Sequence, residues 1–193
     1  MANRNTTGFG LIAQGTLGST PATGGQGKYY IQANYATSLY QGTAVKQSGG
    51  YIITAQAAIT NTCIGVLNGV FYNAATTQKP TWSNYYSQVT PANSENITAF
   101  VIDNPHQLYV GMIDTAIPIA NMGATFGFAT TTGSTTSGQS TNKMLLAGGS
   151  ATANTWRTVR IAEDPENQDI TVANCSVVFV QNLNQYANGV TMA

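Results

Sequence analysis

Short runs of β-branched and aromatic residues, separated by turn signals, follow one another along the chain from residue 28 onward. Examples are KYYIQA, IGVLNGVFY, NITAFVID, QLYVGMI and NCSVVFVQNL. No stretch repeats its apolar residues at the spacing of three and four that an amphipathic helix needs. Since roughly nine to eleven such runs are present, the sequence predicts an all-β protein, a small antiparallel barrel or sandwich with long loops rich in glycine and threonine.

Glycines mark turns and irregular points within this pattern. Ser48-Gly49-Gly50 separates the runs TAVKQ and YIITAQ, and glycine adopts the positive φ of a two-residue hairpin turn at no steric cost. Gly65 and Gly69 lie inside the run IGVLNGVFY. A glycine inside a strand predicts a bulge or a close approach of another backbone.

The charge content excludes several kinds of partner. Charged residues make up 7% of the chain and the net charge is zero. The basic residues are scattered from Arg4 to Arg160, whereas nucleic acids and anionic membranes require clustered Lys and Arg. No apolar run reaches the ~20 residues that span a bilayer, and the start MANRNTTGFGLIAQG lacks the apolar core of a signal peptide. We expect no nucleic-acid or membrane partner, and a surface suited to packing on other proteins.

Residues 1–27 predict an extended N-terminal arm, and residues 28–193 a single β domain. The stretch GSTPATGGQG in this arm consists of turn formers. Its apolar residues Phe9, Leu11 and Ile12 would pack on a neighbouring subunit. The alternative is a first strand followed by a loop.

The tract TTTGSTTSGQST, residues 130–141, has neither a charge nor a large side chain. Taken alone it resembles a linker between two domains. It lies between ATFGFA and KMLLA, however, which belong to the same series of short β-runs. We predict a surface loop within one domain, ordered by hydrogen bonds from its hydroxyl groups to its own backbone.

Three aromatic residues, Trp82, Tyr85 and Tyr86, occupy a long polar excursion over residues 73–94. Together with Tyr29 and Tyr30, these aromatic residues fill a core or an interface, or stack on a sugar or a base. We expect Trp82, Tyr85 and Tyr86 at a subunit or capsid interface. Burial against another copy of the chain would favour assembly, and an exposed groove beside polar groups would favour sugar binding.

The sequence shows no catalytic or metal-binding pattern, so we expect a protein that is not an enzyme and carries no cofactor. His106 is the sole histidine, and the nearby Asp103 lies on the same predicted turn. The acidic residues of EDPENQD lack the spacing of a calcium loop, and an ordinary turn or a contact with a partner's basic residue accounts for them. Phosphate-binding, dinucleotide-binding and metalloprotease motifs are also missing from the sequence.

The two cysteines, Cys63 and Cys175, lie in the apolar contexts TCIGV and CSVVFV. Free cysteine is among the most buried residue types, which predicts two buried thiols. A disulfide between them is the alternative.

Three pieces of the chain together resemble a known family. They are ANYATSLYQGTAVKQSGGYIITA followed by IGVLNGVFY, then GATFGFATTTGSTTSGQSTNKMLL, then WRTVRIAEDPEN with NCSVVFVQNLNQY. In this order they are similar to the head decoration, or cement, proteins of tailed bacteriophages. The resemblance covers roughly residues 28–186.

This resemblance implies a virion structural protein with a β-hairpin core that binds the outer surface of the capsid as a homotrimer. The partners would be the major capsid protein and other copies of the chain, and assembly would take place in the host cytoplasm. Two alternatives stay open. One is another minor virion protein, such as a head fibre or tail component. The other is a carbohydrate-binding or adhesin β-domain.

Overall fold

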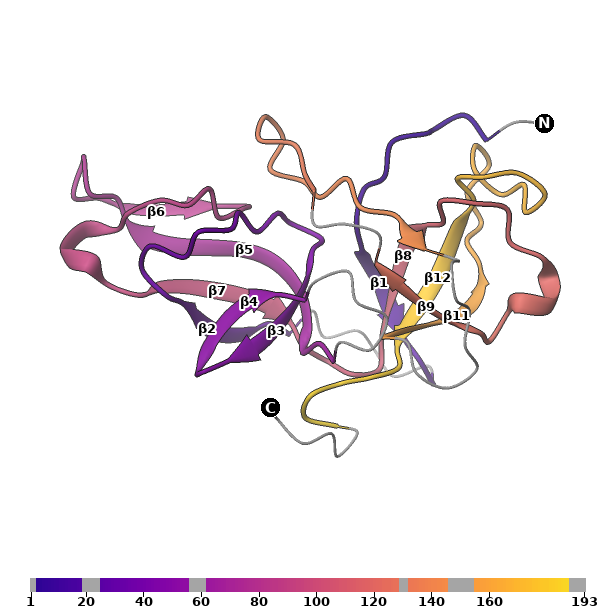
Figure 1. Ribbon diagram of the computed structural model, residues 1–193, viewed down its shortest axis with the longest axis horizontal. Coiled ribbons are helices and arrows are strands. Elements are labelled where there is room, and N and C mark those ends of the chain that lie inside the picture. Colours follow the sequence, from indigo (N-terminus) through magenta and orange to yellow (C-terminus); the bar gives the residue numbers. More distant parts are fainter. Residues whose placement is uncertain (1–2, 19–24, 56–61, 129–131, 146–154, 188–193) are drawn as a thin grey trace.

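The computed structural model describes residues 3–18, 25–55, 62–128, 132–145 and 155–187. Their regular structure is almost entirely strand, in two antiparallel sheets that pack as a sandwich (Figure 1). The predicted all-β class is confirmed, with a sandwich and, over these residues, no closed barrel. Among the described residues no helix is long and apolar enough to cross a membrane.

Sheet A is the six-stranded sheet at the right of Figure 1. Its strands, in spatial order, are β1 (Ile12–Thr16), β8 (Gln107–Met112), β12 (Ser176–Gln181), β11 (Trp156–Ile161), β9 (Thr125–Phe128) and β10 (Met144–Leu145). All residues of the central strand β12 are buried, which matches its continuous apolar sequence. The short 3-10 helix η2 (Ile119–Asn121) precedes β9.

Sheet B lies at the left of Figure 1. Its strands run in the order β2 (Gly27–Ile31), β7 (Ile97–Ile102), β5 (Gly65–Asn73), β3 (Ala44–Ser48) and β4 (Tyr51–Thr54), while β6 (Pro80–Ser83) pairs with the far end of β5. The 3-10 helix η1 (Ala92–Ser94) precedes β7. The predicted hairpin joins β3 to β4, and its two glycines have φ of 56° and 85°.

The chain enters sheet A, leaves it to build sheet B, and then returns. All strands of sheet B come from the continuous segment 27–102. β1 precedes this segment and β8 follows it, yet the two strands pair with each other in sheet A. One hydrophobic cluster surrounds Trp156, Tyr109 and Phe179 and also takes in Ala44 and Val66 from sheet B. A second cluster lies within sheet B, around Ile31, Leu67 and Tyr86. The first cluster therefore holds the two sheets together.

The N-terminal segment is a part of this fold. Its described residues, 3–18, include β1, which pairs with β8. The structure therefore has a first strand here, the alternative that the sequence left open, and not an arm that lies on a neighbouring subunit. Leu11 is 2% exposed and belongs to the cluster around Trp156. The Asn3 side chain donates hydrogen bonds to the carbonyl oxygens of Asp169 and Ala173, 3.0 and 2.8 Å away.

The described part of the Thr/Ser tract, residues 132–141, forms an ordered loop. Its turn is closed by the bond from the Gly138 amide to the Ser134 carbonyl, 2.7 Å. The loop also reaches the other sheet's loops: the Gln41 amide donates to the Gly138 carbonyl and the Ser140 amide donates to the Gln41 carbonyl, at 3.0 and 2.8 Å. The predicted bonds between hydroxyls and the local backbone are confirmed, since the Ser134 and Ser137 hydroxyl oxygens accept from the amides of Ser137 and Gln139, both at 3.3 Å. The loop additionally connects the two halves of the molecule.

Both cysteines are free and buried, which confirms the predicted thiols and excludes the disulfide. Burial raises the pKa of Cys63 to about 12 and that of Cys175 to about 11. The Gln181 side-chain amide donates to both the carbonyl oxygen and the sulfur of Cys63, at 2.9 and 2.7 Å. Cys63 therefore packs as a satisfied core residue between the C-terminal segment and sheet B.

We expect neither thiol to react with a disulfide reagent at pH 8 while the protein is folded, because the reactive thiolate is suppressed and the sulfur is covered. Both should react at once in guanidinium.

The pKa values of the two thiols are raised from 9.0 in the unfolded chain. The contribution of these thiols to the free energy of unfolding is thus complete below pH 9 and declines between pH 9 and 12. Fast labelling of either native thiol would contradict the burial.

Candidate functional site

An exposed aromatic surface covers the outer side of sheet B. We call it the aromatic face, and it consists of Lys28 and Tyr30 on β2, Phe100 on β7, Phe71 on β5 and Trp82 on β6. The strand register brings these residues to one side, because Lys28 lies opposite Phe100 and Phe71 lies opposite Trp82. Tyr30, Trp82 and Phe71 are 56%, 53% and 40% exposed. Exposed apolar side chains gathered on one face make it a candidate interaction site.

Gly69 gives this surface its shape. The Trp82 ring lies over Gly69 and reaches Phe100, with ring centroids 5.1 Å apart. A Cβ atom at residue 69 would come within 2.5 Å of the indole. The prediction of a close approach at Gly69 is confirmed, as is that of a bulge, because the register between β5 and β7 shifts between Leu67 and Gly69.

The three aromatic residues of the excursion over residues 73–94 separate in the structure. Trp82 is the exposed one. The Tyr85 ring stacks on Tyr40 at 5.6 Å, and its hydroxyl donates to the Thr135 carbonyl at 3.1 Å, so it holds the Thr/Ser loop. Tyr86 is fully buried in the core of sheet B. The prediction that Tyr86 contacts another subunit is wrong, because its side chain completes the protein's own core.

The three apolar residues of the N-terminal segment, Phe9, Leu11 and Ile12, also differ in burial. Leu11 is buried, so the prediction that it packs on a neighbouring subunit is also wrong. Ile12 is 47% exposed and Phe9 is half-buried. Both line a cavity between the two sheets, and they remain candidates for an interface.

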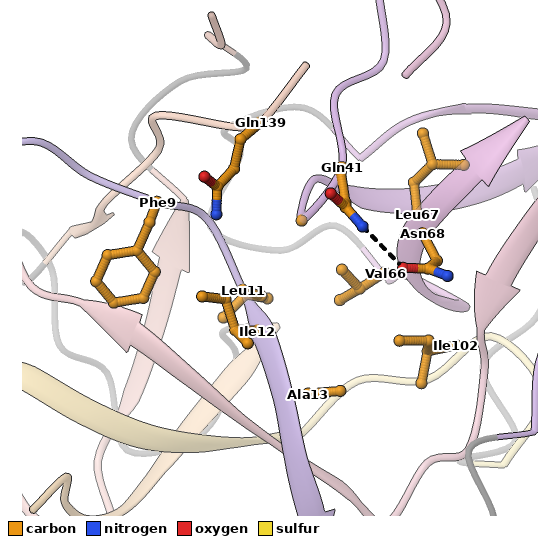
Figure 2. Close-up of a pocket in the computed structure, with 11 residues that line it drawn as sticks. Phe9, Leu11, Ile12, Ala13, Gln41, Val66, Leu67, Asn68, Ile102 and Gln139 are labelled. Carbon is orange, nitrogen blue, oxygen red and sulfur yellow. Dashed lines mark hydrogen bonds between the residues drawn. The ribbon is translucent and has the colours of Figure 1, made fainter. Parts of the chain in front are cut away.

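This cavity has a volume of about 270 Å³ (Figure 2). We call it the cleft. One wall comes from the N-terminal segment and β1, the other from β5 and the end of β7, and the loops at Gln41 and Gln139 border the opening. The lining residues are Phe9, Leu11, Ile12, Ala13, Gln41, Gly42, Val66, Leu67, Asn68, Ile102 and Gln139.

Backbone hydrogen bonds tie the N-terminal segment to a loop from each half of the molecule. At the upper end of the cleft the Leu11 amide donates to the Gly42 carbonyl at 2.9 Å, and the Gly10 amide donates to the Asn142 carbonyl at 3.1 Å. Gln41 and Gln139 face each other in a parallel bridge. The N-terminal segment thus passes between two loops that both bind it, and the walls of the cleft are tied to one another.

The acidic residues of the turn at 163–169 form hydrogen bonds and an ion pair with other residues of the same chain. Asp164 accepts hydrogen bonds from the Ser176 hydroxyl at 2.9 Å and from the Glu166 amide at 3.1 Å. Glu166 lies 3.4 Å from Arg4, both side chains being exposed. Hydrogen bonds from Thr171 lower the pKa of Asp169 to about 2. A basic residue does meet this turn, and it belongs to the protein's own N-terminal segment.

His106 lies in the turn between β7 and β8. His106 is exposed, and its backbone amide bonds the Asn104 side chain in a turn. Asp103 accepts a 2.8 Å hydrogen bond from the Tyr29 hydroxyl, and burial together with this bond raises the pKa of Tyr29. Over the described ranges no group of three His, Cys, Asp or Glu side chains could hold a metal ion.

The sequence identified Trp82 and Tyr30 but missed the rest of the aromatic face and the three amides of the cleft: Phe71, Phe100, Gln41, Asn68 and Gln139. Strict alternation in ITAFVI would have placed Phe100 opposite the buried Ile97, Ala99 and Val101. The amides carry no such signal, since Asn and Gln are spread over the whole chain.

Comparison with known proteins gave no relatives: no family model, no curated protein and no solved structure matches this chain.

Proposed function

We propose that this protein is a virion structural protein without catalytic activity, a capsid decoration protein that binds the outside of a phage head as an oligomer and stabilises the shell. The aromatic face is the observation that carries the proposal. A chain with 7% charged residues exposes three large aromatic side chains on one side of sheet B. Aromatic residues are enriched at the centres of protein interfaces, where a few of them supply most of the binding energy.

The three sequence pieces that resemble decoration proteins, taken in their order, support a capsid as the partner of this surface. The major capsid protein would bind the aromatic face, and other copies of the chain would complete the oligomer. A protein that binds only the expanded shell stabilises that shell by mass action. Contacts repeated by the symmetry of an oligomer then add up through avidity.

Replacing Trp82 by Ala tests the docking face. Because the indole is 53% exposed, the stability of the free protein should change little. The dissociation constant for expanded heads that lack the protein should rise about thirtyfold, the loss expected for a central aromatic residue. The measurements are occupancy, from sedimented heads, and the melting temperature of the heads.

Ile119→Ala is the matched control, because Ile119 is 65% exposed but lies on η2, away from the aromatic face. It should bind heads as the unchanged protein does. Equal losses for both variants would remove the aromatic face from the interface. Failure of the unchanged protein to bind heads at any concentration would refute the capsid assignment itself.

Carbohydrate binding is the second candidate, and one observation favours it. Trp82 and Tyr30 are exposed on sheet B with Thr98 between them, since Thr98 on β7 lies opposite both Tyr30 and Phe71. Aromatic rings beside hydroxyl groups suit the apolar faces and hydroxyls of a sugar. Quenching or enhancement of tryptophan fluorescence by neutral oligosaccharides, lost in Trp82→Ala, would support this function over docking to a capsid.

A further inference from the structure

We propose that the cleft binds an uncharged, extended segment of a partner polypeptide, which adds as a strand alongside Ile12 and Ala13, at the edge of β1 away from β8. This site is separate from the aromatic face and does not depend on the capsid assignment. Four features of the cleft point to it: its neutrality, the strand edge in its wall, a pair of amides at its opening and a bulge in each wall.

The lining of the cleft is uncharged. None of its 11 residues carries an ionisable side chain. Leu11, Val66 and Ile102 form an apolar floor, while the polar groups are the amides of Gln41, Asn68 and Gln139. A charged segment would lose its hydration here without gaining a counter-charge. The lining therefore selects a neutral segment with small apolar side chains.

The edge of β1 away from β8 faces the cleft at Ile12 and Ala13. β1 is the last strand of sheet A and pairs only with β8 among the described strands. Just before β1, the Leu11 amide points away from β8 and bonds Gly42, on the side of the cleft. Ile12 and Ala13 follow on this wall. An unpaired strand edge can accept an extended peptide through main-chain hydrogen bonds, the common mode of strand addition.

Two amides at the opening match the polar groups of a peptide bond. Gln41 donates from its Nε2 to the Asn68 Oδ1 at 3.0 Å, which leaves its carbonyl oxygen directed toward the opening (Figure 2). The Gln139 Nε2 points into the opening from the other side (Figure 2). A peptide group has one donor and one acceptor. Its N–H would bond the Gln41 oxygen, and the C=O of the peptide would accept from Gln139.

Both walls carry a β-bulge where they meet the cleft. The register of β1 against β8 shifts between Ala13 and Gly15, and that of β5 against β7 shifts between Leu67 and Gly69. Bulges interrupt pairing and redirect side chains, and they concentrate beside functional sites. In β5 the extra residue is Asn68, whose amide orients Gln41. A cleft with walls tied together in advance also loses little entropy when a segment binds.

The test uses the full chain, labelled with ¹⁵N, and a short capped peptide of alternating threonine and valine. We expect shifts of the Ile12 and Ala13 backbone amides and of the Gln41 and Gln139 side-chain NH₂ groups. The same peptide methylated at alternate backbone nitrogens should bind at least about tenfold more weakly, because it has the same side chains but cannot complete the strand ladder.

Gln139→Glu should weaken binding of the unmethylated peptide about tenfold, since it places a charge at the opening and replaces the donor by an acceptor. Gln32→Glu is the matched control. Gln32 is exposed just after β2 and does not line the cleft, so its variant should bind normally. The signals of the Trp156 indole and of the β12 amides report whether each variant is folded.

Four outcomes would overturn the proposal. They are shifts confined to residues outside the cleft, equal binding of the methylated peptide, equal binding by Gln139→Glu, and no binding at the highest soluble peptide concentration. If the NMR signals of the same cleft residues shift when the protein concentration alone is raised, the occupant of the cleft is a second copy of this chain and not a segment of another protein.

Discussion

Removing residues 2–16 is expected to lower the melting temperature by at least about 10 °C, the shift that ~5 kcal/mol produces in a chain of this size. The deletion takes away β1, so that β8 becomes an unpaired edge, and it empties the place of Leu11 in the core. Losing a buried Leu side chain alone costs about 2–5 kcal/mol. The bonds from Asn3 to the segment 169–173 are lost as well. Circular dichroism during heating measures the effect.

Two neighbouring point variants separate the contributions. Leu11→Ala should cost about 2–4 kcal/mol, because Leu11 is 2% exposed. Ile12→Ala should cost below about 1 kcal/mol, since Ile12 is 47% exposed. An unchanged melting curve for the deletion would mean that the N-terminal segment is an arm independent of the β fold, as the sequence first suggested.

Local pattern was sufficient to predict most of the individual strands. NITAFVID became β7 with strictly alternating burial, and NCSVVFVQNL became the fully buried β12. The Gly49-Gly50 hairpin followed from the need for positive φ at both positions. These features depend on residues close together in the sequence, where side-chain alternation and backbone sterics act directly.

The pairing of β1 with β8 could not be predicted in this way. The two strands are joined through all of sheet B, and nothing in the sequence IAQGT specifies QLYVGM as its partner. The segment also has one buried apolar residue, Leu11, beside an exposed one, Ile12, a pattern that fits an arm as well as an edge strand. Only the long-range arrangement of the two sheets decides between these possibilities.

The aromatic face shows a related limit. Tyr29 and Tyr30 are adjacent, and a strand sends them to opposite sides, Tyr29 against the core of sheet B and Tyr30 to solvent. Which of the two faces outward is set by the register with β7. Trp82 is likewise exposed while Tyr86 is buried, because β6 ends at Ser83 and the chain then turns toward the core. Composition predicts that aromatic residues matter here, while register determines which of them a partner can reach.

Gly10→Ala is expected to destabilise the protein by about 2–5 kcal/mol, through two effects that add. Gly10 has φ of 70°, which costs a residue with a side chain about 1–2 kcal/mol. A Cβ atom there would also lie 2.7 Å from the Gly42 carbonyl oxygen and 2.7 Å from the Ser140 Cβ. Forcing these loops apart costs a further ~1–3 kcal/mol. Chemical denaturation measures the sum.

Gly18→Ala separates the two effects. Gly18 has φ of 85°, but a Cβ atom there would meet nothing within 4 Å. Its variant should show only the backbone cost of about 1–2 kcal/mol. The excess for Gly10 then measures how rigidly the loops at Gly42 and Ser140 are held against the N-terminal segment. Equal costs for both glycines would mean that these loops yield freely, and the cleft below them would then not be the fixed site that strand addition at β1 requires.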